Sequence, residues 1–240
     1  MKWIKIIVVI LLISGGRVIK GEKMNIKNLP DEEKELLNTV DPWGLAFSDQ
    51  LKRFQSYFQN NKKNFVVGFT HNLVKIWQNK YWFRGKIAGK DEVEPLWGVT
   101  GSTVSFQVAI LPEIGAEKQE YEVKVKAPVK VKTFREIFVK VGSAPYVRFQ
   151  SNFWTDPLIE ENKCILDGIK TGVFLIELKI PEDFKNAKFK CEVEIVSEKK
   201  EKVRFSVPVE VVKLKIDPQN FPLVAWFSRG KLTDIQFRNM

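Results

Sequence analysis

A two-residue alternation of apolar and polar side chains is the feature that most limits how this chain can fold, and it begins after residue 63. Successive side chains of a strand point to opposite faces, so this period predicts strands with one buried face. The clearest runs lie at 102–110, 174–180 and 189–195, and others lie at 65–70, 121–125, 137–141 and 203–216. Many short strands separated by turn signals predict a mainly β fold, an antiparallel β-sandwich of Ig-like or jelly-roll-like type.

The last run carries two further signals. Its apolar residues hold odd positions from Val203 to Val211 and even positions from Val212 to Ile216. A change of face inside an extended run requires a bulge or a crossover between sheets. Pro208 lacks a backbone N–H, which predicts an edge position there.

Helical spacing replaces the alternation before residue 63. An early Pro and three acidic residues follow Asn28, which indicates a helix start. A second helix is expected from a cap at Ser48, with apolar residues at helical spacing, to Asn60-Asn61. We therefore expect a helical N-terminal extension over residues 22–62 and the sandwich over 63–217.

The two ends of the chain differ in composition from the rest. Lys2 and Lys5 precede an apolar run from Ile6 to Ile13, which is too short to span a bilayer. This predicts a signal segment over residues 1–21, export to the cell envelope or medium, and no stable membrane span after cleavage. Residues 218–240 have the composition of a linker or tail, and a further domain could begin there.

The positive charge does not predict a nucleic-acid partner. Removing the four cations of residues 1–21 lowers the formal net charge from +10 to +6. The remaining lysines alternate with apolar residues, as in 122–126, which is typical of a solvated sheet face. Richness in Lys, Glu and Ile is compatible with a thermophilic source.

The sequence predicts no catalytic, metal or cofactor site. His71 is its one histidine and is expected at a surface or strand end, and Asp91-Glu92 is expected to be solvated rather than catalytic. Cys164 and Cys191 are too few for a structural zinc site. An exported protein permits a disulfide between them, but Cys191 shares its strand parity with Phe189 and Val193, which favours burial as a small apolar residue.

Aromatic residues provide the strongest hypothesis for a binding site. Aromatic faces stack on sugar rings, so an exposed group would form a carbohydrate platform. The candidates are Trp77, Tyr81, Trp82, Trp97 and Trp154. The alternative is that the segment from 77 to 97 seals the junction between the helices and the sandwich. We expect 149–159, which contains Trp154, Asp156 and Pro157, to form a turn.

Five stretches, in order, resemble the N-terminal β-sandwich of glycoside hydrolase family 123. They lie within residues 65–227 and are Gly68–Ile76, Thr103–Val108, Trp154–Leu158, Leu175–Pro181 and Val203–Pro222. In that family the sandwich precedes a catalytic barrel, and this sequence contains none. The resemblance implies an exported non-catalytic module accessory to carbohydrate processing. The module is either free-standing or truncated, and in the second case a catalytic barrel is encoded downstream. The alternative is a cell-envelope scaffold that binds protein partners through a sheet edge or through the aromatic segment.

Overall fold

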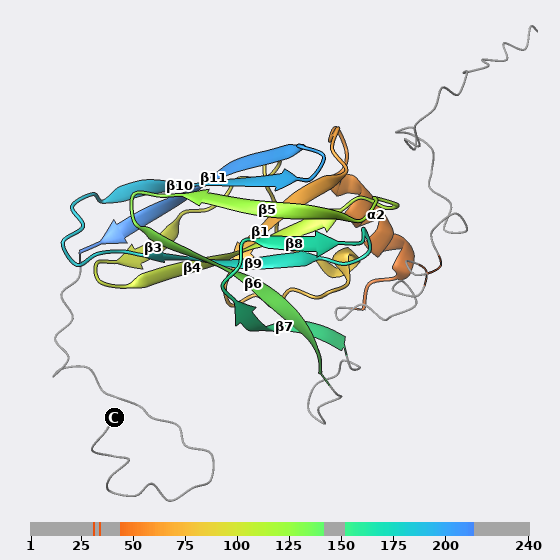
Figure 1. Ribbon diagram of the computed structural model, residues 1–240, viewed down its shortest axis with the longest axis horizontal. Helices are drawn as coiled ribbons and strands as arrows, with labels where there is room; N and C mark the ends of the chain where they lie inside the picture. The colour runs from red at the N-terminus through yellow and green to blue at the C-terminus, as the bar shows by residue number, and fades with distance from the viewer. Residues whose placement is uncertain (1–30, 32–33, 35–43, 142–151, 214–240) are drawn as a thin grey trace, which may run out of the picture.

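The computed structural model describes residues 31, 34, 44–141 and 152–213. They form a β-sandwich of two sheets, with a short helix at one end (Figure 1). The six-stranded sheet has the order β2 (Lys86–Ile87), β1 (Phe65–His71), β4 (Thr103–Pro112), β9 (Gly172–Lys179), β6 (Lys130–Val141), β7 (Asn152–Ile159). The five-stranded sheet has the order β3 (Leu96–Val99), β11 (Lys202–Val212), β10 (Lys188–Ser197), β5 (Gln119–Lys126), β8 (Lys163–Leu166). The predicted fold class is confirmed.

All the described strand pairs are antiparallel except β3 with β11. β3 pairs only with Val209–Val212, so β11 has no β3 neighbour at Pro208. The predicted edge position of this proline is therefore confirmed. Within β11 the buried residues stay at odd positions, and Val212 is exposed. The predicted change of face at Leu214 and Ile216 lies outside the described residues.

The main core lies between the two sheets. β9 contributes Phe174, Ile176 and Leu178, and these side chains are fully buried. β10 buries its alternate residues from Phe189 to Ile195, as the alternation predicted. On β6 the alternation does not separate a buried face from an exposed face, because Ile137 and Val139 are only half-buried beside the edge strand.

A second apolar cluster covers the outer face of the six-stranded sheet. β1, β4 and β9 present Val66, Ala109 and Val173 to this face, opposite to the residues that fill the main core. The helix α2 (Phe47–Tyr57) and the segment around the 3₁₀ helix η2 (Lys80–Trp82) pack over them. These strands are therefore buried on both faces, which explains their nearly continuous apolar runs.

The helical region differs from the expectation at its start. α2 begins at Phe47, so Ser48 lies inside the first turn and Ala46 stands at the cap position. The amide N–H groups of Asp49 and Gln50 donate to the backbone oxygen of Ala46, which starts the helix before the serine. Past its end, Asn60 has a φ of 65°, which an asparagine adopts more readily than most residues. The earlier expected helix lies almost entirely outside the described residues.

The expected turn at 149–159 is wrong over its described part. Residues 152–159 form the edge strand β7, and Glu136 and Phe138 of β6 pair with Leu158 and Thr155. Two residues of β7, Asp156 and Pro157, therefore stand opposite one residue of β6, which is the arrangement of a β-bulge. A proline fits a bulge in an edge strand because no ladder hydrogen bond is required of it there.

Candidate functional site

The structure separates the five predicted platform residues. Trp77, Tyr81 and Trp82 are buried, with exposed fractions of 6%, 1% and 2%. They cannot offer a face to a sugar, so their assignment to a carbohydrate platform is wrong in this structure. Trp97 is 68% exposed. Trp154 lies on β7 and pairs with Val139 of β6, but its side chain lies outside the described residues.

The three buried aromatic residues join α2 to the sandwich. The rings of Phe54 and Tyr81 lie 4.8 Å apart, and those of Trp77 and Trp82 lie 5.3 Å apart. The indole N–H of Trp82 donates to Oε1 of Gln50 over 3.1 Å. The alternative interpretation, that these residues seal the junction between helix and sandwich, is the one that the structure supports.

A buried lysine reinforces the same junction. Lys80 is fully buried, and its Nζ donates to the backbone oxygen of Gly168 over 2.6 Å. The ammonium group also lies 5.2 Å from the centre of the Phe54 ring, within the range of a cation–π interaction. Lys80 therefore ties η2 to the loop before β9, and its place in the packing accounts for it without a binding role.

Trp97 is exposed because its neighbours in β3 face the core. Leu96 and Gly98 are buried, and alternation along the strand turns the indole outward. A Cβ atom at Gly98 would lie 2.4 Å from Cδ1 of Ile180 and 2.5 Å from Cγ2 of Val104. Glycine is thus required there, because it lets β3 lie close to the core and present Trp97 at the edge of the sheet.

Trp97 lies on a groove of about 410 Å³, which we call the Trp97 groove. This volume is within the usual range of small-ligand sites. The groove runs between β3 and the start of β4 and is also lined by the end of β1. The lining residues are His71, Asn72, Pro95, Leu96, Trp97, Gly98, Val99, Ser102, Thr103, Val104 and Ser105.

Unequal strand lengths open this groove. β1 pairs with β4 from Phe106 to Pro112, whereas β9 pairs with β4 from Thr103. The first part of β4, from Thr103 to Ser105, therefore has a strand neighbour on one side alone among the described residues. β3 faces it from the other sheet. The sequence did not predict this groove, because its walls come from strand ends that are far apart in the chain.

The polar groups of the groove are hydroxyls and an amide. Nδ2 of Asn72 donates to Oγ of Ser105 over 2.8 Å. Oγ of Ser102 donates to the backbone oxygen of Val99 over 2.6 Å and accepts from its N–H over 3.1 Å. These bonds hold polar side chains of the groove lining in fixed positions.

The residues for which the sequence predicted no catalytic role lie at the end of a strand and beside a turn. His71 is exposed at the end of β1, as predicted. Oδ2 of Asp91 accepts the N–H of Ile87 over 2.6 Å, so this carboxylate holds a turn, and Glu92 is exposed. Among the described residues, no three His, Cys, Asp or Glu side chains gather as a metal site would require.

The two cysteines are free thiols in the described structure. Cys164 lies on β8 and Cys191 on β10, and β5 separates these strands. Two strand spacings place the Cα atoms at least about 9.5 Å apart, beyond the reach of a disulfide. Burial raises the pKa of each thiol to about 12. The open question of a disulfide is thus answered in favour of burial.

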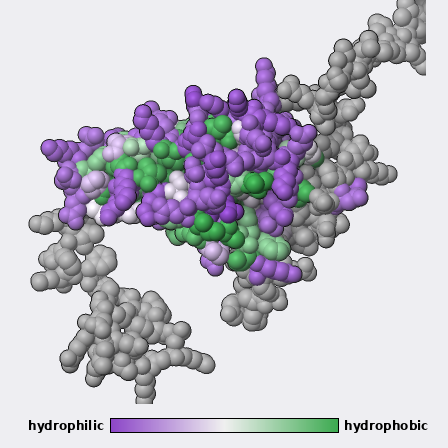
Figure 2. All heavy atoms as spheres, in the orientation of Figure 1, coloured by the Kyte–Doolittle hydropathy of each residue, from purple (hydrophilic) through white to green (hydrophobic). Residues whose placement is uncertain are grey.

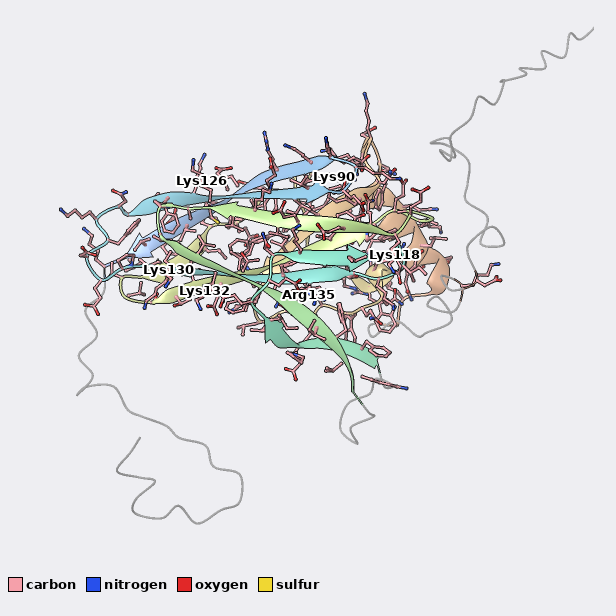
Figure 3. All side chains as sticks on the ribbon, viewed as in Figure 1. Lys90, Lys118, Lys126, Lys130, Lys132 and Arg135 are labelled. Carbon is pink, nitrogen blue, oxygen red and sulfur yellow. The ribbon has the colours of Figure 1, made fainter. Side chains whose placement is uncertain are left out.

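Lysine and glutamate side chains form ion pairs across the outer face of the five-stranded sheet. Lys188 contacts Glu210 over 2.8 Å, and Lys163 contacts Glu120 over 2.8 Å. The labelled cations of Figure 3, from Lys90 to Arg135, are spread along the sandwich rather than gathered at one place. This agrees with a solvated sheet face. Within the described residues, no helix has the length and apolar character that a membrane span requires.

Comparisons with known proteins identify folds rather than a family. No protein-family model matches this sequence, and no curated protein matches it. A family 123 glycoside hydrolase from Clostridium perfringens has a similar structure, with 11% identity and a TM-score of 0.49. The match covers 62% of this chain and 28% of that chain. The predicted resemblance to this family therefore has a distant structural counterpart.

Other β-domains are similar with lower TM-scores. A PapD-like domain of human CEP192 has 11% identity and a TM-score of 0.28, with 52% of this chain and 86% of that chain covered. The collagen binding subdomain of the Enterococcus faecalis surface protein ACE has 7% identity and a TM-score of 0.25, with 50% and 99% covered. Similarities this distant carry no argument about function.

Proposed function

We propose that this protein is an exported, non-catalytic β-sandwich module that serves carbohydrate processing by binding a glycan in the Trp97 groove. The exposed indole of Trp97, beside a groove lined by hydroxyl and amide groups, carries the proposal. A sugar ring has an apolar face that stacks on an indole, and its hydroxyls bond to neutral donors and acceptors. The groove offers both kinds of contact within one site.

The module has no catalytic residue of its own in this proposal. Its relation to glycoside hydrolases rests on the resemblance of residues 65–227 to the sandwich of family 123. Hydrolysis would then be supplied by a separate barrel domain encoded downstream, and the module would position substrate for it. Sequencing the adjoining reading frame tests that part: barrel-like sequence there would indicate a split hydrolase, and its absence a free-standing module.

A glycan array tests the binding itself. The wild-type protein, Trp97→Ala and Ile165→Ala are applied to the same array. Ile165 is a matched control because it is 63% exposed and lies on β8, at the opposite edge of the sheet that contains Trp97. We expect glycan binding by the wild type and by Ile165→Ala and its loss in Trp97→Ala. Flat arrays for all three proteins would refute the proposal.

A second candidate function, a protein-binding scaffold of the cell envelope, is favoured by one specific surface. Figure 2 shows hydrophobic surface over β6 and β7. The exposed apolar side chains of β7 are Phe153, Leu158 and Ile159. The segment before η2 reaches β7, since the N–H of Gln78 donates to the backbone oxygen of Phe153 over 3.2 Å. Loss of a co-purifying envelope protein on Leu158→Ser, with Trp97→Ala unaffected, would favour this function.

A further inference from the structure

We infer that the Trp97 groove selects uncharged glycans and excludes those that carry carboxylate or sulfate groups. This inference rests on the proposed function and names the ligand class of the same site. It follows from the charges of the groove, which differ from those of the chain as a whole. A formal net charge of +10 by itself would suggest an acidic ligand.

None of the described residues that line the groove is an Asp, Glu, Lys or Arg. Its polar side chains are those of His71, Asn72, Ser102, Thr103 and Ser105. The outer face of the five-stranded sheet is rich in lysine and glutamate. The groove differs from that face because its described lining has none of these side chains. The groove is therefore built from hydrogen-bonding side chains that carry no carboxylate, ammonium or guanidinium group, and from apolar surface.

Charged residues of both signs pair with the groove strands across the strand ladders. Glu177 pairs with Ser105, and Lys179 pairs with Thr103, in the ladder between β4 and β9. On the other side, Glu210 pairs with Trp97 in the ladder between β11 and β3. Its carboxylate already contacts Lys188 over 2.8 Å. The surroundings thus supply charge of both signs, and no Lys or Arg of the described residues lines the groove.

A charged sugar would lose more than it gains in such a site. Bringing a carboxylate or sulfate against the indole removes part of its hydration shell, and the groove returns no ion pair. A neutral sugar exchanges hydroxyl–water bonds for bonds to the hydroxyl and amide groups and buries its apolar face. The contrast predicts selectivity for neutral glycans and an affinity that does not depend on salt.

Acidic glycans are expected to bind elsewhere, if they bind at all. The lysines on the outer sheet face attract polyanions from a distance, and salt screens such an interaction. Binding of that kind would not involve Trp97. Salt dependence and the effect of Trp97→Ala therefore separate groove binding from adsorption to the lysine-rich surface.

The test is calorimetry on the full chain with two sets of hexasaccharides. The neutral set contains cellohexaose, xylohexaose and chitohexaose, and the anionic set contains oligogalacturonate and a heparin hexasaccharide. Each titration is run in about 50 mM and about 500 mM NaCl. The proteins are the wild type, Trp97→Ala and Ile165→Ala. Far-UV circular dichroism and urea unfolding confirm that each variant is folded.

We expect at least one neutral hexasaccharide to bind with less than about a twofold effect of salt on Kd. Trp97→Ala should weaken this binding at least about tenfold, and Ile165→Ala should leave it unchanged. Trp97-dependent binding of the anionic set without the neutral set would overturn the inference and leave the proposed function standing. No Trp97-dependent binding by either set would overturn both.

Discussion

Replacing Trp82 and Trp97 separately by alanine distinguishes the packing role of one tryptophan from the surface role of the other. Trp82 is 2% exposed and belongs to the cluster between α2 and the sandwich. Loss of a buried tryptophan side chain costs about 3–5 kcal/mol of unfolding free energy. The change also leaves Oε1 of Gln50 buried without the donor it has at 3.1 Å, at a further cost of about 1–3 kcal/mol. We expect a loss of roughly 4–8 kcal/mol in all.

Trp97→Ala should behave in the opposite way. Its side chain is 68% exposed, and substitutions at such positions change stability by about 0.5 kcal/mol. For a chain of this size, each kcal/mol shifts Tm by about 2–4 °C. Thermal and urea unfolding, followed by circular dichroism, should therefore show a fall in Tm of about 8–32 °C for Trp82→Ala and of about 2 °C or less for Trp97→Ala.

A double-mutant cycle separates the hydrogen bond from the packing. Trp82→Phe keeps an aromatic ring but leaves Gln50 without its donor, and Gln50 is 1% exposed. Adding Gln50→Leu removes the buried acceptor and also the bond from Nε2 of Gln50 to the backbone oxygen of Leu45, so the double variant should regain only part of the stability that the phenylalanine variant lost. If Trp82→Ala proved no more destabilising than Trp97→Ala, the assignment of Trp82 to the interior would be refuted.

Three further predictions concern the scaffold. Gly168→Ala should cost more than about 2 kcal/mol, because φ is +82° and the added Cβ would meet the backbone oxygen of Ala116 at 2.1 Å. Gly89→Ala, with φ of +76° and open space, should cost only about 1 kcal/mol in the same urea titration. The two cysteines should not react with a thiol reagent at neutral pH until the protein unfolds, and prompt labelling of the native protein would contradict their burial. Burial raises the pKa of Glu136, so the native state holds this proton more tightly than the unfolded chain and stability falls as pH rises above the ordinary value of 4.5. Glu136→Gln should therefore raise Tm at neutral pH and not below pH 4.5, while the exposed Glu92→Gln should change neither value.

The sequence predicted the sandwich best where one face of a strand is clearly core. β10 shows why, because it alternates strictly and packs one face against the opposite sheet. The prediction was less useful for β6, whose outer face carries the buried Glu136 and the partly buried Phe138. A strand near the edge of a sheet is covered unevenly on both faces, and a two-residue period does not report this.

The aromatic segment shows a different limit of prediction. Trp77, Tyr81 and Trp82 have no helical or strand period, because they lie on and around a single 3₁₀ turn. Whether such residues are buried depends on α2, which lies about thirty residues earlier and packs over them. Nothing in the local spacing distinguishes them from Trp97. The distinction arises only when β3 is placed, with Gly98 facing the core.

The Asp-Pro pair of β7 was misassigned because a bulge and a turn favour the same residues. A proline without an N–H and an exposed aspartate both fit a chain reversal, and both also fit the interruption of an edge strand. Exposed edges pair readily with other chains, and bulges, prolines and charges oppose such pairing. Asp156 and Pro157 thus protect β7 from strand addition, so a partner at this edge would have to contact side chains such as Leu158 rather than the backbone.

The Trp97 groove differs from that edge because its shape follows from topology rather than from side chains alone. β1 ends at His71 while β4 begins at Thr103, and β3 is held by its parallel pairing with β11. A substitution at Trp97 therefore removes the platform and leaves the groove walls in place. Loss of ligand binding in Trp97→Ala, with stability retained, would then report on the stacking contact itself, whereas the same loss in a core variant would report only on folding.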